Sequence, residues 1–113
     1  MPDVPFRKII VEQLEQLSSE REQLQYERNV PNVDITAELI WLWSSVAYHP
    51  ADPKFTVSFS ERELNALTDF NQTFEKNKPF LPASRGTVGT WLDDAHWREV
   101  MQAAASTLAV LGA

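Results

Sequence analysis

The stretch DITAELIWLWSSVAY, residues 34–48, decides the fold of this chain. Its apolar side chains are Ile35, Leu39, Leu42 and Val46 on one helical face, with Ile40, Trp43 and Ala47 beside that face. A helix that is apolar around most of its circumference is buried by the rest of the protein. Asp34 suits the N-cap, and Pro50 and Pro53 end the helix because proline cannot continue one. We therefore expect a central buried helix over residues 34–48.

Two of the four tryptophans, Trp41 and Trp43, lie in this stretch. On a helix they point about 200° apart, so a helix that carries both must be covered on two sides or leave one ring exposed. Tryptophan is enriched among the residues that contribute most to protein interfaces. We expect Trp43 in the core and Trp41 partly at a surface. The candidate partner-binding residues are Trp41, Trp43, Trp91 and Trp97, together with Arg21.

A long amphipathic helix is predicted over residues 5–28, with Pro5 at its first position. The residues that would face a second helix in a coiled coil, which we call the seam, recur at spacings of four, three, four and three. They are Ile10, Leu14, Leu17, Arg21 and Leu24. The seam spans about two heptads, fewer than a secure coiled coil has, so an ordinary bundle helix and a homodimer through this helix both remain open. Arg21 either extends its head into water or sets the register of a dimer by pairing with a glutamate.

The segment after the prolines alternates apolar and polar side chains at Phe55, Val57 and Phe59, which is the period of a half-buried strand. Five residues alone do not make a sheet, and residues 87–91 are the candidate partner strand. We expect either a short β-ribbon packed on helices or an extended segment that lies on the core.

Ser60 and Glu63 match a capping box, in which each side chain bonds the backbone of the other residue. The pattern predicts a helix that starts at Glu61 and is bounded by Pro79. Its apolar face consists of Leu64, Leu67, Phe70 and Phe74.

A final helix is predicted from near Thr90 or Asp93 to Gly112. Its apolar positions are Trp97, Val100 or Met101, Ala104, Leu108 and Leu111. Small side chains that would let another backbone approach closely occupy Ala103, Ala105, Ser106 and Ala109.

The residues before this helix, 79–89, form a loop by composition. Backbone N–H groups at a helix start bind anions, and the candidate anion-binding residues are Arg85, Gly86, Thr87, Gly89 and Thr90. The segment lacks the lysine and the spacing of a phosphate loop, so an ordinary glycine turn is the alternative.

No motif for catalysis or for a cofactor is present in the sequence. Metal donors gather at Asp93, Asp94, His96 and Glu99, but helix capping and surface charge also account for these residue types. Neither of the two histidines has a serine in a nucleophile elbow to activate. We therefore assign no catalytic residue, no metal ligand and no cofactor.

Composition restricts the classes of partner. The net charge is −6, and the ten lysines and arginines are scattered, so the basic surface that nucleic-acid binding needs is missing. The apolar runs 39–48 and 100–113 are shorter than the roughly 20 residues of a membrane span. The chain has no cysteine, and its first residues do not resemble a secretory signal, so we expect a cytoplasmic protein.

Together these patterns predict a mainly α, single-domain four-helix arrangement over residues 1–113, with at most a short β-ribbon. The expected function is non-enzymatic: an acidic protein that binds another protein, such as an inhibitor or neutralising partner of a basic protein. Two alternatives remain, a ligand-binding or enzymatic helical domain with a tryptophan-lined pocket, and a self-associating structural subunit.

Overall fold

The computed structural model describes residues 5–30, 35–81 and 88–112. Its long helical segments are α1 (Phe6–Ser18), α3 (Ile35–Trp41) with its continuation as the π-helix η1 (Leu42–Ala47), α5 (Glu61–Asn77) and α7 (Ala95–Val110). The shorter elements are α2 (Glu20–Asn29), α4 (Pro53–Thr56), the 3-10 turn η2 (Lys78–Phe80) and α6 (Val88–Leu92). These described ranges contain no strand, and the predicted mainly α fold is confirmed.

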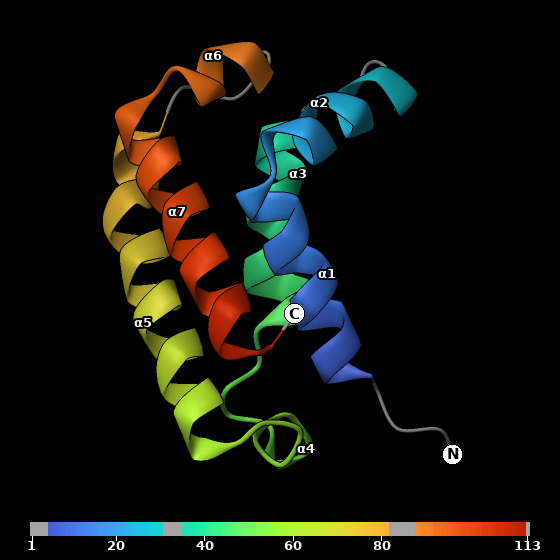
Figure 1. Ribbon diagram of the computed structural model, residues 1–113, viewed down its shortest axis with the longest axis vertical. Helices are drawn as coiled ribbons and strands as arrows, with labels where there is room; N and C mark the ends of the chain where they lie inside the picture. Colours follow the sequence, from blue (N-terminus) through green and yellow to red (C-terminus); the bar gives the residue numbers. More distant parts are fainter. Residues whose placement is uncertain (1–4, 31–34, 82–87, 113) are drawn as a thin grey trace.

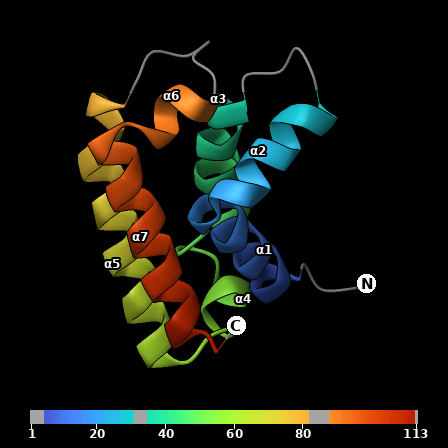
Figure 2. The same ribbon diagram turned by 45° about the horizontal axis from the view of Figure 1, so that its top comes forward.

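The long segments run alternately up and down the molecule (Figure 1). α5 and α7 lie antiparallel in one layer, and α1 and α3 form a second layer beside it, as Figures 1 and 2 show from two directions. α7 packs against both α1 and α5. The short helices lie at the two ends, with α2 and α6 at one end and α4 at the other (Figure 1). The result is the predicted four-helix arrangement with short helices added at its ends.

One hydrophobic core fills the space between the layers. Its largest fully buried apolar side chains are Ile10, Leu14, Leu17, Leu39, Trp43, Phe55, Leu67, Phe70, Phe74, Trp91 and Trp97. Each such side chain contributes about 1.5 to 3 kcal/mol relative to an exposed one. The predicted apolar faces of the first, third and last helices therefore supply most of the core.

The predicted first helix is interrupted at Ser19, so the expectation of one continuous helix was wrong. Ser19 has an extended backbone (φ −111°, ψ 114°), and its side chain accepts a hydrogen bond from the N–H of Glu22 as the N-cap of α2. The break changes the register of the following residues. Gln23 becomes buried, whereas Arg21 lies exposed on α2.

For residues 55–59, the expectation of either a strand or an extended segment is also wrong, because Pro53–Thr56 form the helix α4. Asp52 caps α4 by accepting from the N–H of Lys54, and Pro53 occupies the first turn, where its missing N–H is not needed. Phe55 is fully buried, whereas Val57 is 82 % exposed. The predicted partner segment is helical as well, because its described residues 88–91 belong to α6.

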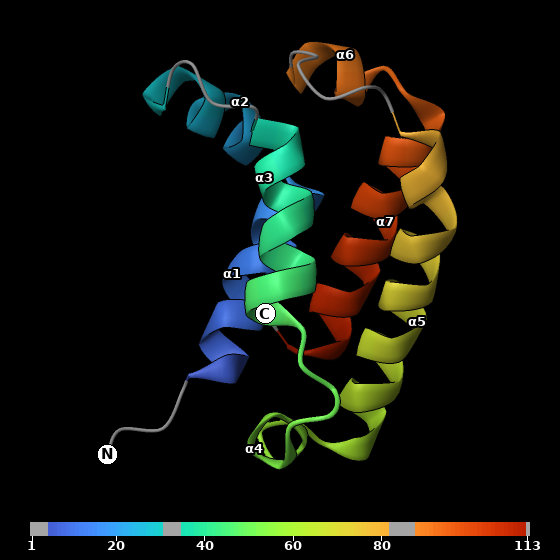
Figure 3. The same ribbon diagram turned by 180° about the vertical axis from the view of Figure 1, so that it is seen from behind.

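The helix predicted over residues 34–48 lies in the outer part of its layer rather than at the centre. Seen from behind, α3 lies in the foreground (Figure 3). Its buried positions are Leu39, Trp43 and Ala47, whereas Val46, expected in the core, is 38 % exposed. The π-helix accounts for the shift, since its wider turn rotates later residues away from the α-helical face. The predicted N-cap Asp34 lies outside the described residues.

The predicted starts of the last two long helices, α5 and α7, agree with the structure better than the predictions for the first two helices do. The capping box of Ser60 and Glu63 is confirmed, with both reciprocal hydrogen bonds present at 3.2 and 2.9 Å. The last helix begins at Ala95, because the Asp94 side chain accepts from the N–H groups of His96 and Trp97.

Candidate functional site

Three of the four candidate tryptophans are core residues. Trp43 is fully buried, and its Nε1 donates to Oδ1 of Asn71 at 3.0 Å. Trp97 is fully buried and donates through Nε1 to Oε1 of Gln23 at 3.0 Å. Trp91 meets the Trp97 ring edge-on at a centroid distance of 5.0 Å. All three rings are buried within this chain and present almost no exposed surface, so their assignment as partner-binding residues stays a prediction.

Trp41 is different, because 58 % of it is exposed. The offset of about 200° between residues two apart on a helix explains the division, since the helix that buries Trp43 must turn Trp41 outward. Val46 is exposed five residues later. Because a π-helical turn closes between residues five apart, Val46 lies one turn beyond Trp41 on the outer face.

The π-turn itself is held by aromatic packing. The N–H of Tyr48 donates to the carbonyl of Trp43 at 3.0 Å, and the two rings stack at 5.1 Å with an interplanar angle of 11°. Phe70 meets the Trp43 ring edge-on at a centroid distance of 4.7 Å. An α-helical turn would separate residues five apart by about 140°, so the stack needs the π geometry.

A carboxylate lies one turn before Trp41. Glu38 and Trp41 are three residues apart on α3 and therefore neighbours on its surface. The Tyr26 hydroxyl donates to Oε1 of Glu38 at 2.9 Å, which joins α2 to α3. Burial and the hydrogen bond to Glu38 raise the pKa of the Tyr26 phenol. We call the face formed by Glu38, Trp41, Ser45 and Val46 the Trp41 surface.

Sequence reasoning did not identify Glu38 and Tyr26 as site residues. The spacing of three residues between Glu38 and Trp41 was a readable signal. No pattern in the sequence predicts the contact between Tyr26 and Glu38, because it joins two separate helices.

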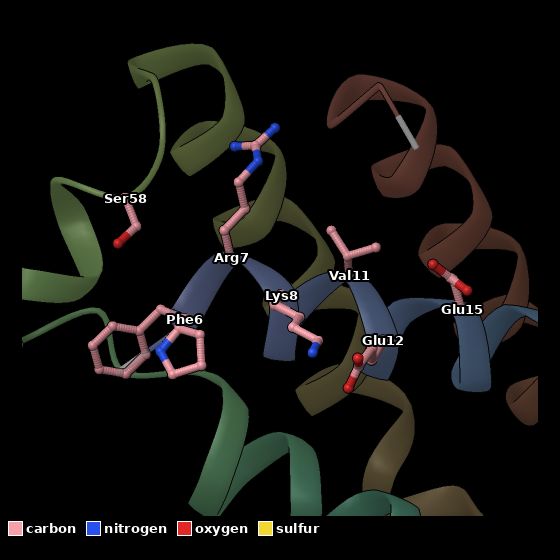
Figure 4. A pocket seen from close by; sticks show the side chains of 8 residues that line it. Phe6, Arg7, Lys8, Val11, Glu12, Glu15 and Ser58 are labelled. Carbon is pink, nitrogen blue, oxygen red and sulfur yellow. The ribbon is translucent and has the colours of Figure 1, made fainter. Parts of the chain in front are cut away.

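Three surface hollows are described, and none is lined by a tryptophan. The largest has a volume of about 630 Å³ and is lined by Pro5, Phe6, Arg7, Lys8, Val11, Glu12, Glu15 and Ser58 (Figure 4). Arg7 points away from Lys8 and Glu12 in this view and pairs with both carboxylate oxygens of Glu63 at 2.9 and 2.7 Å. The hollow therefore mixes both signs of charge, and its charged residues do not favour one class of ligand.

The candidate anion site is only partly within the described residues, since Arg85, Gly86 and Thr87 lie outside them. Gly89 and Thr90 belong to α6 and are exposed. At the start of α6 the N–H of Val88 donates to Oε2 of Glu27 at 2.8 Å. The chain thus places its own carboxylate where an external anion was expected to bind.

The predicted dimer seam is buried inside one chain. Ile10, Leu14 and Leu17 are fully buried in the core that α1 shares with α7. Arg21 is exposed and forms no ion pair with a described residue. The homodimer hypothesis therefore loses the apolar surface on which it was based.

The histidines and the acids near them have structural partners. His49 Nε2 bonds the carbonyl of Val46 at 2.9 Å, and His96 Nδ1 bonds Oδ1 of Asn77 at 2.9 Å. Both acceptors are carbonyl oxygens, so these ring nitrogens carry the proton. Asp94 caps α7, and Glu99 pairs with Lys76. Among the described residues, no group of three or more potential ligands could hold a metal ion.

Comparisons with protein-family models, with curated proteins and with solved structures find no match to this chain. Within the described ranges, every helix is too short or too polar to cross a membrane. The function must therefore be argued from the surface of the molecule.

Proposed function

We propose that this chain is a non-enzymatic protein that binds another protein, with Trp41 at the centre of the surface that it uses. The observation that carries the proposal is the 58 % exposure of Trp41 in a chain that buries its other tryptophans. Covering an exposed apolar surface gains about 25 cal/mol per Å². Val46 adds a second apolar side chain, and the polar groups of Glu38 and Ser45 border them, as in the rim of an interface.

The charge of the chain favours a basic partner. The net charge is −6, and among the described acids only Glu20, Glu63 and Glu99 form ion pairs. Carboxylates without a paired base contribute to a negative field that attracts a positive protein and raises its association rate. The proposed class is an acidic inhibitor or neutralising protein that covers a basic surface on its partner.

Affinity capture from a lysate of the source cells tests this function with three baits: the wild type, Trp41→Ala and Val57→Ala. Val57 is the matched control, because it is an apolar side chain that is 82 % exposed near α4. We expect the wild type and Val57→Ala to retain the same basic protein and Trp41→Ala to lose it. Raising the salt concentration should release that protein, because salt screens exposed charges. The same proteins on all three baits would contradict the proposal.

A further inference from the structure

A hollow of about 450 Å³ lies between the end of α1 and one face of α2. Its lining consists of Gln16 from α1 and of Glu22, Gln25, Tyr26, Asn29 and Val30 from α2 and its C-cap. The α2 residues recur three or four positions apart, so they share one helical face. We call this feature the α2 hollow.

The polar groups of the α2 hollow favour a positive charge. Glu22 is the only charged lining residue, and it forms no ion pair with a described residue. α2 ends at Asn29, so the negative end of its helix dipole lies at the hollow. Glu38, bonded to the Tyr26 hydroxyl, places a second carboxylate next to the hollow. Arg21 and Arg28 are exposed on a neighbouring face of α2 and do not line it.

An arginine side chain fits this set of groups better than a metal ion or an anion does. Its guanidinium offers five donors, which match the Glu22 carboxylate and the side-chain oxygens of Gln25 and Asn29. Tyr26 and Val30 provide apolar area for the aliphatic stem. A divalent metal ion would find a single carboxylate among the lining residues, and an anion would be repelled by it.

We propose that the α2 hollow receives an arginine side chain of the protein that binds at the Trp41 surface. The inference rests on the proposed function. Tyr26 lines the hollow and bonds Glu38, and Glu38 belongs to the Trp41 surface, so the two features are contiguous. A single basic segment that crosses from one to the other would contact both.

Titration of isotope-labelled protein with a tetra-arginine peptide, followed by NMR, tests the hollow directly. The variants are Glu22→Gln and, as a matched control, Glu75→Gln. Glu75 is exposed on α5 and forms no ion pair with a described residue, so its substitution changes the net charge equally. We expect shifts at Gln25, Tyr26 and Asn29, and binding about tenfold weaker for Glu22→Gln than for Glu75→Gln. Equal weakening by both substitutions, or shifts spread over the whole surface, would overturn the proposal.

A tetra-lysine peptide and Trp41→Ala complete the test. Tetra-lysine should bind more weakly than tetra-arginine, because an ammonium lacks the planar fork of donors; equal binding would contradict an arginine site. Trp41→Ala separates the two proposals. If the hollow fails, the Glu22 effect on the peptide disappears while capture still depends on Trp41. If the Trp41 surface fails, capture no longer depends on Trp41 while the Glu22 effect remains.

Discussion

Gln23 is the polar residue on which the α1–α2 junction depends. It is fully buried, and its Nε2 donates to the carbonyls of Gln16 and Leu17, which α1 leaves without helical partners at its end. Its Oε1 accepts from the indole of Trp97. A single amide therefore caps α1 and ties α2 to α7.

Gln23→Ala should lower the free energy of unfolding by about 2 to 4 kcal/mol, because it leaves a buried indole N–H without an acceptor and opens a cavity. Gln25→Ala is the control, since Gln25 is exposed on the same helix and should change stability by less than about 0.5 kcal/mol. Urea unfolding of both variants measures the difference. Equal losses would mean that the Gln23 bonds do not hold the junction.

Glu63 makes the free energy of unfolding depend on pH in the acidic range. The bidentate bond from Arg7 and the capping bonds with Ser60 lower the pKa of the Glu63 carboxyl from 4.5 to about 2. A lowered folded-state pKa stabilises the protein above the unfolded value, and this contribution is lost as the pH falls from 4.5 toward 2.

Glu63→Gln should therefore flatten the dependence of unfolding free energy on pH in that window. Glu61→Gln, at an exposed neighbour without an ion pair to a described residue, should leave the wild-type slope unchanged. Denaturant unfolding at several pH values compares the three proteins. Parallel curves for the wild type and Glu63→Gln would exclude this linkage.

At the scale of elements, α3 and η1 divide their tryptophans between core and surface. Trp43→Ala should cost about 3 to 5 kcal/mol, because it removes a fully buried ring that stacks on Tyr48 and bonds Asn71. Trp41→Ala should cost less than about 1 kcal/mol, since most of its ring is in water. Thermal and urea unfolding of the two variants test this. Large, equal losses would place both rings in the core.

Local signals predicted some element boundaries and missed others. The capping box at Ser60 was readable because all its partners lie within four residues. Ser19 and Glu22 repeat the same spacing and mark the start of α2, but the apolar seam across them favoured one long helix. Asp52 likewise suits an N-cap, and Pro53 suits the first turn of a helix. These two helix signals outweigh the alternation of apolar and polar side chains over residues 55–59.

The π-turn and the α2 hollow depend on contacts between distant residues, which the sequence pattern could not predict. The stack of Tyr48 on Trp43 needs a π-turn, and no hydrophobic period distinguishes that turn from an α-turn. The spacing of two residues predicted that Trp41 and Trp43 point to different sides, and the position of Trp43 beside the apolar face favoured Trp43 as the buried ring. The α2 hollow depends on the break at Ser19, so it could not be predicted from one continuous helix.

At the scale of the whole molecule, the buried seam of α1 argues against a homodimer through this helix. Arg21→Leu should leave the mass in solution unchanged and alter stability by less than about 1 kcal/mol, because Arg21 is exposed on α2. Sedimentation of the wild type and the variant over a range of concentrations measures this. A wild-type dimer whose dissociation constant falls in the variant would contradict this prediction and support a homodimer through the seam.

Site-specific photo-crosslinking tests most directly whether this molecule meets its partner at the Trp41 surface. A photoreactive phenylalanine analogue replaces Ser45 of that surface in one protein and Val57 in another, because both positions are exposed and Trp41 itself stays in place. After irradiation in lysate, we predict that position 45 forms one discrete adduct with a basic protein and that position 57 does not. An adduct from position 57 alone, the same adduct from both positions, or none from position 45 would contradict this assignment of the partner surface.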